Sequence, residues 1–347
     1  MQTKSMRGRD FISTLEFTKD ELESILEVAA RLKADNAEGR QHELLKNKTL
    51  FAIFYNRSLR TRNSFETGMT QLGGHTNYLD ADKIYTPAVA GEEKAYQTER
   101  VSDVARVLSR FGDAISIRLY GNPTGWKYGH GNEYLREFAK WASIPVINME
   151  DDVYHPCQSM ADVLTMKEKL GDLRNKKLVV SWAYSPSVQK PVSVPQCLMA
   201  TASKFGMNIC FARPKGFELD PTIMDAVRDN VTRYGGSFEE TDSMQDAFKN
   251  ADVVYPKAWA SLSLFPPQAP EFMEEKQKEL FNKNKNWICD DRMMKLAKPD
   301  ALYMHCLPCD RGHEVTDSVA DGPNSVIFDE AENRLHAHKA IMALVMG

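Results

Sequence analysis

The sequence predicts an α/β fold of two domains, each built as a doubly wound parallel sheet. Its 347 residues suit two domains of ordinary size. Short apolar segments alternate with segments of helical periodicity along the chain, a pattern typical of repeated βα units and parallel sheets. Hydrophobic residues make up 42% of the chain, which favours packed cores over disorder.

The first domain is expected over residues 1–153. Apolar residues at helical spacing occupy the first 45 residues, and a compact apolar strand comes next. Ser58 is placed to cap the following helix, which Gly73 and Gly74 end. The predicted elements after the first helix are strand 49–55, the helix from Ser58 to Gly73, helix 101–111, strand 114–119, helix 134–142 and strand 144–149.

The second domain is expected over residues 154–328. Pro156 opens a helix that Gly171 closes, and a hinge is expected near this helix. A final helix over 329–347 is expected to pack back on the first domain. The predicted strands of the second domain are 178–184, 209–212, 253–255, 302–306 and 325–328, with helices such as 221–234 between them.

Composition excludes several classes of protein. The 44 Lys and Arg residues against 48 Asp and Glu give a formal charge of −4, which disfavours a general polyanion binder. No apolar run approaches the roughly 20 residues that span a bilayer. The first residues mix in charges and lack the apolar stretch of a secretory signal, so a cytoplasmic location is expected. Six scattered cysteines indicate free thiols in a reducing compartment.

Ligands of open α/β sheets bind at the carboxyl ends of the strands, so the residues that follow strands are the candidates for a site. Ser58-Leu59-Arg60-Thr61-Arg62 follows the first strand at the start of a helix. Backbone N–H groups, hydroxyls and forked guanidinium groups together suit a phosphate. No GxxxxGK[ST] or GxGxxG pattern follows a strand, so neither ATP nor NAD is expected. A capped helix with surface arginines remains the alternative.

Two further places carry polar groups suited to a carbonyl substrate. Arg118 lies near the end of an apolar strand, and His155 and Gln158 begin the helix opened by Pro156. An imidazole and a primary amide together can polarise a carbonyl oxygen and hold an NH₂ group. A histidine at a helix cap is more often structural, and that alternative stays open.

The segment His305-Cys306-Leu307-Pro308-Cys309 ends a predicted strand and contains one CxxC pair. A second pair of ligands at zinc-finger spacing is missing, and so is a thioredoxin or haem context. We therefore expect no metal here, and backbone carbonyls at the strand end are the favoured functional groups.

These motifs together resemble those of the aspartate and ornithine carbamoyltransferases. Ser-Leu-Arg-Thr-Arg is similar to their carbamoyl phosphate loop, the His155 and His305 motifs to their HPxQ and HCLP signatures, and the segment 328–336 to the last helix of ornithine-type members. The resemblance implies carbamoyl transfer with no cofactor, with carbamoyl phosphate bound by the first domain and the amino-acid substrate by the second. It implies that the phosphate is bound by Ser58, Leu59, Arg60, Thr61 and Arg62. Arg118, His155 and Arg334 would stabilise the developing oxyanion and the leaving phosphate, and Gln158 would hold the carbamoyl NH₂.

The amine substrate depends on finer resemblances. The loop 254–260 lacks the Asp and Ser-Met-Gly of ordinary ornithine enzymes and resembles that of the N-acetylornithine and N-succinylornithine carbamoyltransferases. The segment 182–195 is similar to the proline-rich loop of that knotted group, and closer still to an uncharacterised knotted subgroup. The resemblance implies a knot in the second domain around residues 184–195.

Within this group, the expected substrate is N-acetyl- or N-succinylornithine. Glu150 and Lys257 would contact its amide and carboxylate, and the carbonyls of Cys306 and Leu307 would orient its amine. Glu314 stands where the acylornithine enzymes have a lysine. Ornithine or another amine, and a non-catalytic anion-binding homologue, are the alternatives.

The resemblance also implies homotrimers with active sites shared between subunits. The segment 80–97 contains Pro87 and Gly91 and has no clear period, which indicates a mobile loop. Tyr85 is expected to cover carbamoyl phosphate in the neighbouring subunit. The alternative is a disordered surface loop in which the tyrosine has no role.

Overall fold

The computed structural model describes residues 6–40 and 42–347, and the chain divides into two compact units. Unit 1 contains the described residues up to Thr124, Gly129–Met160 and Asn333–Gly347; unit 2 contains Gly125–Tyr128 and Ala161–Glu332. Each unit has its own parallel sheet, which confirms the predicted fold class. Residues 1–5, at the start of the segment used to exclude a secretory signal, lie outside the described residues.

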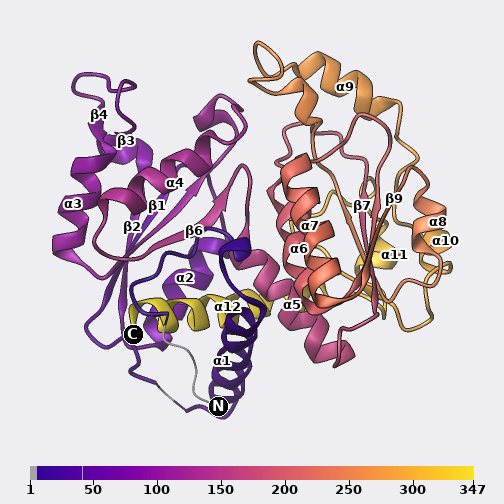
Figure 1. Ribbon diagram of the computed structural model, residues 1–347, viewed down its shortest axis with the longest axis horizontal. Helices are drawn as coiled ribbons and strands as arrows, with labels where there is room; N and C mark the ends of the chain where they lie inside the picture. The colour runs from indigo at the N-terminus through magenta and orange to yellow at the C-terminus, as the bar shows by residue number, and fades with distance from the viewer. Residues whose placement is uncertain (1–5, 41) are drawn as a thin grey trace. The chain divides into compact units, whose positions relative to one another are not determined.

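The sheet of unit 1 has four parallel strands in the order β2-β1-β5-β6. Helices α3 and α4 pack on the core of Ile53, Ile115 and Ile117. On the other side of the sheet, α2 lies beside the last helix, α12 (Figure 1). The elements are α1 (Lys19–Ala37), β1 (Thr49–Phe54), α2 (Arg60–Gln71), β2 (His75–Asp80), β3 (Thr86–Ala88), β4 (Thr98–Arg100), α3 (Val101–Phe111), β5 (Ala114–Leu119), α4 (His130–Trp141) and β6 (Val146–Asp151).

The sheet of unit 2 has five parallel strands in the order β11-β10-β7-β8-β9. Two helices, α5 (Pro156–Leu170) and α12 (Ile327–Met346), contribute residues to both units. The other elements are β7 (Lys177–Trp182), α6 (Ser193–Ala202), β8 (Asn208–Ala212), α7 (Pro221–Tyr234), β9 (Ser237–Thr241), α8 (Met244–Phe248), β10 (Val253–Lys257), α9 (Glu274–Asn282), α10 (Asp291–Met294), β11 (Leu302–Tyr303) and α11 (Asp317–Ala320).

Several elements differ from the sequence prediction, and one of them, the short strand β3, lies within the segment 80–97 that was expected to be a loop. Strands β2 and β9 lie at sheet edges with mostly exposed or half-buried residues, so neither has the apolar run that marks a buried strand. The predicted strand 325–328 is wrong, because helix α12 begins at Ile327. Ser325 forms only an isolated bridge with Tyr303. The prediction failed because a short apolar run is equally typical of a strand and of the start of a buried helix. No described helix is long and apolar enough to cross a membrane.

Candidate functional site

The loop after β1 leads directly into the first turn of α2. The N-cap of α2 is Leu59 rather than the predicted Ser58, but Ser58 Oγ still accepts a hydrogen bond from the Thr61 backbone N–H at 3.1 Å. Thr61 is buried, whereas the Leu59 side chain is 74% exposed. The helix start therefore offers backbone N–H groups and the positive end of the helix dipole at the carboxyl end of β1.

Arg118 brings its guanidinium to the same end of the sheet. It lies near the end of β5, beside Glu150 of the neighbouring strand β6. Its Nη1 lies 2.5 Å from Glu150 Oε2 and 3.4 Å from Thr61 Oγ1, and its Nη2 donates to the Tyr120 hydroxyl at 2.9 Å. Both members of the Arg118–Glu150 ion pair are almost completely buried.

His155 stands at the start of α5, held by a turn that Asp151 organises. Asp151 accepts backbone hydrogen bonds from Val153 and Tyr154 at 2.7 and 2.6 Å, and its other oxygen accepts from the side chain of Asn148. The His155 carbonyl in turn accepts from the backbone N–H of Gln158. These bonds fix the direction in which the imidazole leaves the backbone.

The imidazole of His155 is buried among cations. Burial lowers its pKa well below the ordinary value, and Arg334, Arg118, His338 and Arg60 lower it further. Its Nε2 lies 3.5 Å from Glu150 Oε2, and its Nδ1 has no hydrogen-bond partner within the described part of the chain. The ring is therefore neutral at pH 7.

Arg334 completes this group from the other end of the sequence. It lies on α12 and donates through Nη2 to Thr61 Oγ1. Three guanidinium groups thus lower the pKa of one imidazole, which is neutral. Glu150 lies among them through its ion pair with Arg118. An excess of buried positive charge next to a helix start suits a phosphate dianion.

Two of the residues predicted for this site, Arg62 and Tyr85, are exposed. Arg62 is exposed, with its Nε 2.8 Å from Glu66 and its guanidinium 3.7 Å from the ring centre of Tyr78. Tyr85 is 56% exposed, in the segment between β2 and β3. Gln158 is buried in the first turn of α5. Glu150, predicted to contact the amine substrate, lies within ion-pair distance of both Arg118 and His155.

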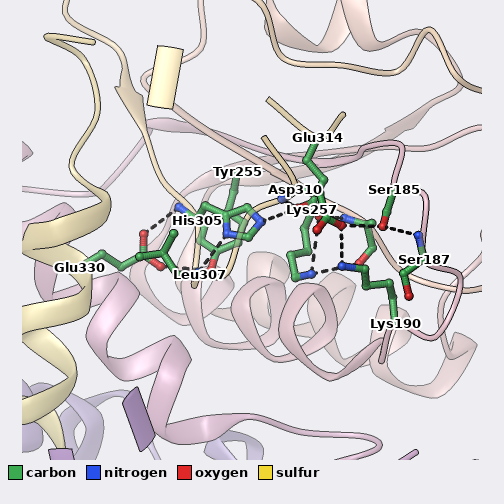
Figure 2. Close-up of polar contacts among 11 residues, drawn as sticks. Ser185, Ser187, Lys190, Tyr255, Lys257, His305, Leu307, Asp310, Glu314 and Glu330 are labelled. Atoms are coloured by element: carbon green, nitrogen blue, oxygen red, sulfur yellow. Dashed lines mark hydrogen bonds and ion pairs between the residues drawn. The ribbon is translucent and has the colours of Figure 1, made fainter. Parts of the chain in front are cut away.

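A second cluster, in unit 2, contains Lys257, predicted to contact the substrate carboxylate, and Leu307, whose carbonyl was predicted to orient the amine (Figure 2). Lys257 ends β10, and Cys306 and Leu307 follow β11. The Leu307 N–H donates to Nδ1 of His305 at 2.9 Å, and Nε2 of the same ring lies 3.4 Å from Glu314 Oε2. The turn after β11 is thus tied to a buried histidine.

Glu314 is fully buried and connects the loops after β10 and β11. Its carboxylate accepts the backbone N–H of Ala258 and of Asp310, both at 2.7 Å, and lies 3.7 Å from Lys257 Nζ. Burial opposes its ionisation, but Lys257, His305 and Lys190 outweigh that effect and hold the pKa of Glu314 well below its ordinary value. Glu314 is therefore ionised.

Lys190 and Asp310 form a second ion pair in this cluster. Asp310 Oδ2 lies 2.6 Å from Lys190 Nζ and accepts from the Ser185 hydroxyl at 2.6 Å (Figure 2). Lys190 lies in the proline-rich loop. It was not predicted as a site residue, because its pairing with Asp310 depends on how two distant loops fold together. His338 was also missed, although it lies one helical turn after Arg334 on α12. Among the described residues, no three His, Cys, Asp or Glu side chains are arranged to hold a metal ion.

Comparison with known proteins gives consistent matches over the whole chain. A family model for the carbamoyl-P binding domain of aspartate/ornithine carbamoyltransferases matches residues 9–168, and one for the Asp/Orn binding domain matches residues 190–345. The ornithine carbamoyltransferase of Thermococcus kodakarensis is 42% identical, covering 99% of this chain and 98% of the relative. The N-acetylornithine carbamoyltransferase of Xanthomonas campestris pv. campestris is 37% identical, covering 99% of both chains.

Two solved structures show the same likeness. The ornithine carbamoyltransferase from Pyrococcus furiosus is 38% identical with a TM-score of 0.84, and 99% of each chain is covered. An acetylornithine transcarbamylase complexed with acetylcitrulline is 35% identical with a TM-score of 0.90, covering 98% of this chain and 99% of that one.

Proposed function

Because the chain belongs to the aspartate/ornithine carbamoyltransferase family, we propose that this carbamoyltransferase moves the carbamoyl group from carbamoyl phosphate to the side-chain amine of ornithine. Membership of this family supports carbamoyl transfer to an amino acid. The observation that carries the assignment to specific residues is the cluster at the start of α2, in which half-buried Arg60 joins the buried side chains of Arg118, His155 and Arg334.

In the proposed reaction, carbamoyl phosphate binds with its phosphate at the start of α2. Ser58, the Leu59 backbone N–H, Arg60, Thr61 and Arg62 would hold the phosphate, and Arg62 would have to leave Glu66 to do so. Gln158 would hold the carbamoyl NH₂ group. This arrangement fixes the carbonyl carbon for attack from one side.

The chemical step needs a neutral amine and a stabilised oxyanion. An alkyl ammonium has an ordinary pKa near about 10, so the amine must lose a proton before it attacks the carbonyl carbon. His155, kept neutral by its surroundings, supplies one N–H, and Arg118 and Arg334 supply positive charge. The C–O bond to phosphate then breaks, the phosphate takes the proton from nitrogen, and citrulline and phosphate leave.

The choice of amine corrects the expectation drawn from the sequence. The loop resemblances favour an acylated ornithine, but the chain shares more residues with the ornithine carbamoyltransferase of T. kodakarensis than with the N-acetylornithine enzyme. The higher TM-score of the acetylornithine transcarbamylase points the other way. Backbone likeness does not report the side chains that select a substrate.

The charges of the unit 2 cluster also support a free amino acid. Lys257 faces Glu314 and Lys190 faces Asp310, so the cluster contains as many carboxylates as ammonium groups. The α-carbon of ornithine likewise carries one ammonium and one carboxylate. If the α-amine is acylated, the substrate keeps its α-carboxylate but loses the positive charge of the α-ammonium. An unpaired buried charge costs free energy.

Competition between amines tests this choice. With both amines present at equal concentration, we expect citrulline to form at least tenfold faster than N-acetylcitrulline, a difference of about 1.4 kcal/mol in transition-state free energy. Products are separated by mass spectrometry. Preferential formation of N-acetylcitrulline or N-succinylcitrulline would restore the acylornithine assignment.

We further propose that the enzyme is a homotrimer in which Tyr85 reaches the neighbouring site, and that the unit 2 chain is knotted around residues 184–195. The exposure of Tyr85 supports the first proposal. Contacts between the proline-rich loop and later segments support the second: the backbone carbonyl of Lys190 accepts from the backbone N–H of Ala260, and the Lys190 ammonium pairs with Asp310. Sedimentation of the intact protein tests the trimer, and a crystallographic chain trace tests the knot.

A further inference from the structure

Helix α12 contacts α2 through a buried histidine that the proposed chemical step does not use. His338 lies one helical turn after Arg334 on α12 and has no exposed surface. Its ring packs on that of Phe65 of α2, with the ring centres 4.4 Å apart and the planes 31° apart. Its Nδ1 lies 2.9 Å from the hydroxyl oxygen of Ser64, also on α2. One side chain thus makes both an apolar and a polar contact between the two helices.

The hydrogen bonds of Ser64 determine which nitrogen of His338 carries the proton. The Ser64 hydroxyl has one hydrogen, which it donates to the Thr61 carbonyl at 3.1 Å. The same oxygen then accepts from His338, so the proton is on Nδ1. With the proton on Nε2 instead, a buried N–H would have no acceptor among the described residues. Burial and Arg334 lower the pKa of His338, which keeps the ring neutral at pH 7.

Thr61 connects this contact to the proposed phosphate site. Its hydroxyl oxygen accepts from Arg334 Nη2 and lies 3.4 Å from Arg118 Nη1. Thr61 is therefore held at its carbonyl by Ser64 and at its hydroxyl by guanidinium groups. A serine hydroxyl that bonds the carbonyl three residues earlier competes with the regular hydrogen bonds of a helix. The direction of the Ser64 hydroxyl therefore affects the geometry of the first turn of α2.

We propose that His338 is a positioning residue for the phosphate of carbamoyl phosphate. Protonated on Nδ1, its ring holds the Ser64 hydroxyl on the Thr61 carbonyl. This keeps the first turn of α2 and the Arg334 guanidinium in the arrangement that binds phosphate. The inference rests on the proposed function for the identity of the ligand. His338 acts through Ser64 and Thr61 and does not itself contact the reacting atoms.

Two substitutions separate the hydrogen bond of His338 from its packing. His338→Phe keeps a ring to pack on Phe65 but has no N–H. In His338→Asn, the amide nitrogen takes the place of Nδ1 and can donate to Ser64. We expect His338→Phe to weaken carbamoyl phosphate binding at least fivefold by calorimetry, while the KM for ornithine at saturating carbamoyl phosphate changes less than twofold. His338→Asn should recover most of the lost affinity. Ser64→Ala should weaken binding as much as His338→Phe does, and the double variant should weaken it no further.

A second polar contact between the same two helices supplies a matched control. Lys339 Nζ donates to Gln71 Oε1 at 2.8 Å, at the last residue of α2, so Gln71→Leu also removes a hydrogen bond between α12 and α2. Gln71→Leu should lower stability in urea unfolding while the Kd for carbamoyl phosphate changes less than twofold. If His338→Phe and Gln71→Leu weaken binding equally, or if a folded His338→Phe protein binds as tightly as the wild type, the inference is overturned.

Inorganic phosphate keeps failure of the proposed function distinct from failure of this inference. If the wild type binds phosphate but transfers no carbamoyl group, the proposed reaction fails. The variants are then compared by their Kd for phosphate, with the same expected order of affinities. Equal Kd values for the wild type and His338→Phe would overturn the inference.

A spectroscopic measurement tests the tautomer without any ligand. In the full-length protein labelled with ¹⁵N-histidine, we expect His338 to give the signals of a neutral ring protonated on Nδ1 at pH 7, assigned by their loss in His338→Asn. A ring protonated on Nε2, or on both nitrogens, would contradict the proposal even if His338→Phe fails to fold.

Discussion

Replacing Glu150 by glutamine should destabilise the free protein and strengthen its binding of phosphate. Glu150 Oε2 lies 2.5 Å from Arg118 Nη1 and 3.5 Å from His155 Nε2, and the Glu150 side chain is 5% exposed. Removing one partner of a buried ion pair costs about 3 to 5 kcal/mol. Because glutamine keeps an oxygen that can accept from Arg118, we expect a loss at the lower end, about 3 kcal/mol.

The same substitution removes a negative charge from the proposed phosphate site. Two charges about 5 Å apart interact by about 3 kcal/mol at an effective dielectric constant of about 20, so even a fraction of this would tighten phosphate binding at least fivefold. Urea unfolding followed by circular dichroism, with and without inorganic phosphate, measures the first effect, and calorimetry measures the second.

Glu27→Gln, which removes an exposed carboxylate on α1, is the matched control and should change neither quantity. The reasoning would be refuted by a Glu150→Gln protein that is as stable as the wild type. Weaker phosphate binding in that variant would also contradict it, because Glu150 would then support the ligand rather than compete with it for Arg118.

Four other predictions concern unit 1. Arg60→Ala should weaken carbamoyl phosphate binding at least tenfold by calorimetry, since it removes a charge-assisted hydrogen bond worth about 1.5 to 3 kcal/mol; unchanged binding would remove Arg60 from the site. His155→Ala should lower kcat about 100-fold or more with a smaller change in KM, as expected for a group that acts on the developing oxyanion; an unaltered kcat would leave it a helix cap. His338 is buried and its pKa is lowered by burial and by Arg334, so below about pH 6.5 the unfolded chain binds a proton that the folded protein does not. Between pH 7 and 5.5 the wild type should therefore lose about 1 kcal/mol relative to His338→Gln in urea unfolding, and parallel pH profiles would contradict this. Inactive Tyr85→Ala and inactive His155→Ala proteins should regain activity when their subunits exchange; no recovery, with exchange shown by mass spectrometry, would remove Tyr85 from the neighbouring site.

The buried strands could be predicted from the sequence because their apolar runs reflect burial on both faces. Strand β1 has one half-buried residue followed by five buried ones, and β5 is buried throughout. The edge strands β2 and β9 lack this signal. Their pairing with β1 and β8 depends on backbone hydrogen bonds, which leave no trace in side-chain composition.

The residues of the candidate site could be predicted from their sequence motifs, but the ion pairs between their side chains could not. The rule that ligands bind at the carboxyl ends of strands places Arg60 and Arg118 at the same edge. The ion pair of Arg118 with Glu150 depends on β5 lying beside β6 and on a shift in register between Ile117 and Arg118. Neither feature can be read from one sequence. The tie between His305 and Glu314 likewise depends on how two loops fold together.

The most direct test of the account follows a labelled carbamoyl group from donor to product. Incubation of the protein with ¹³C-carbamoyl phosphate and ornithine should yield citrulline labelled in its side-chain ureido group, with one phosphate released for each citrulline. Arg118→Met should abolish this transfer, whereas Arg110→Met, which changes an exposed arginine at the end of α3, should not. Release of phosphate without labelled citrulline, or equal transfer by the Arg118→Met protein, would contradict the account.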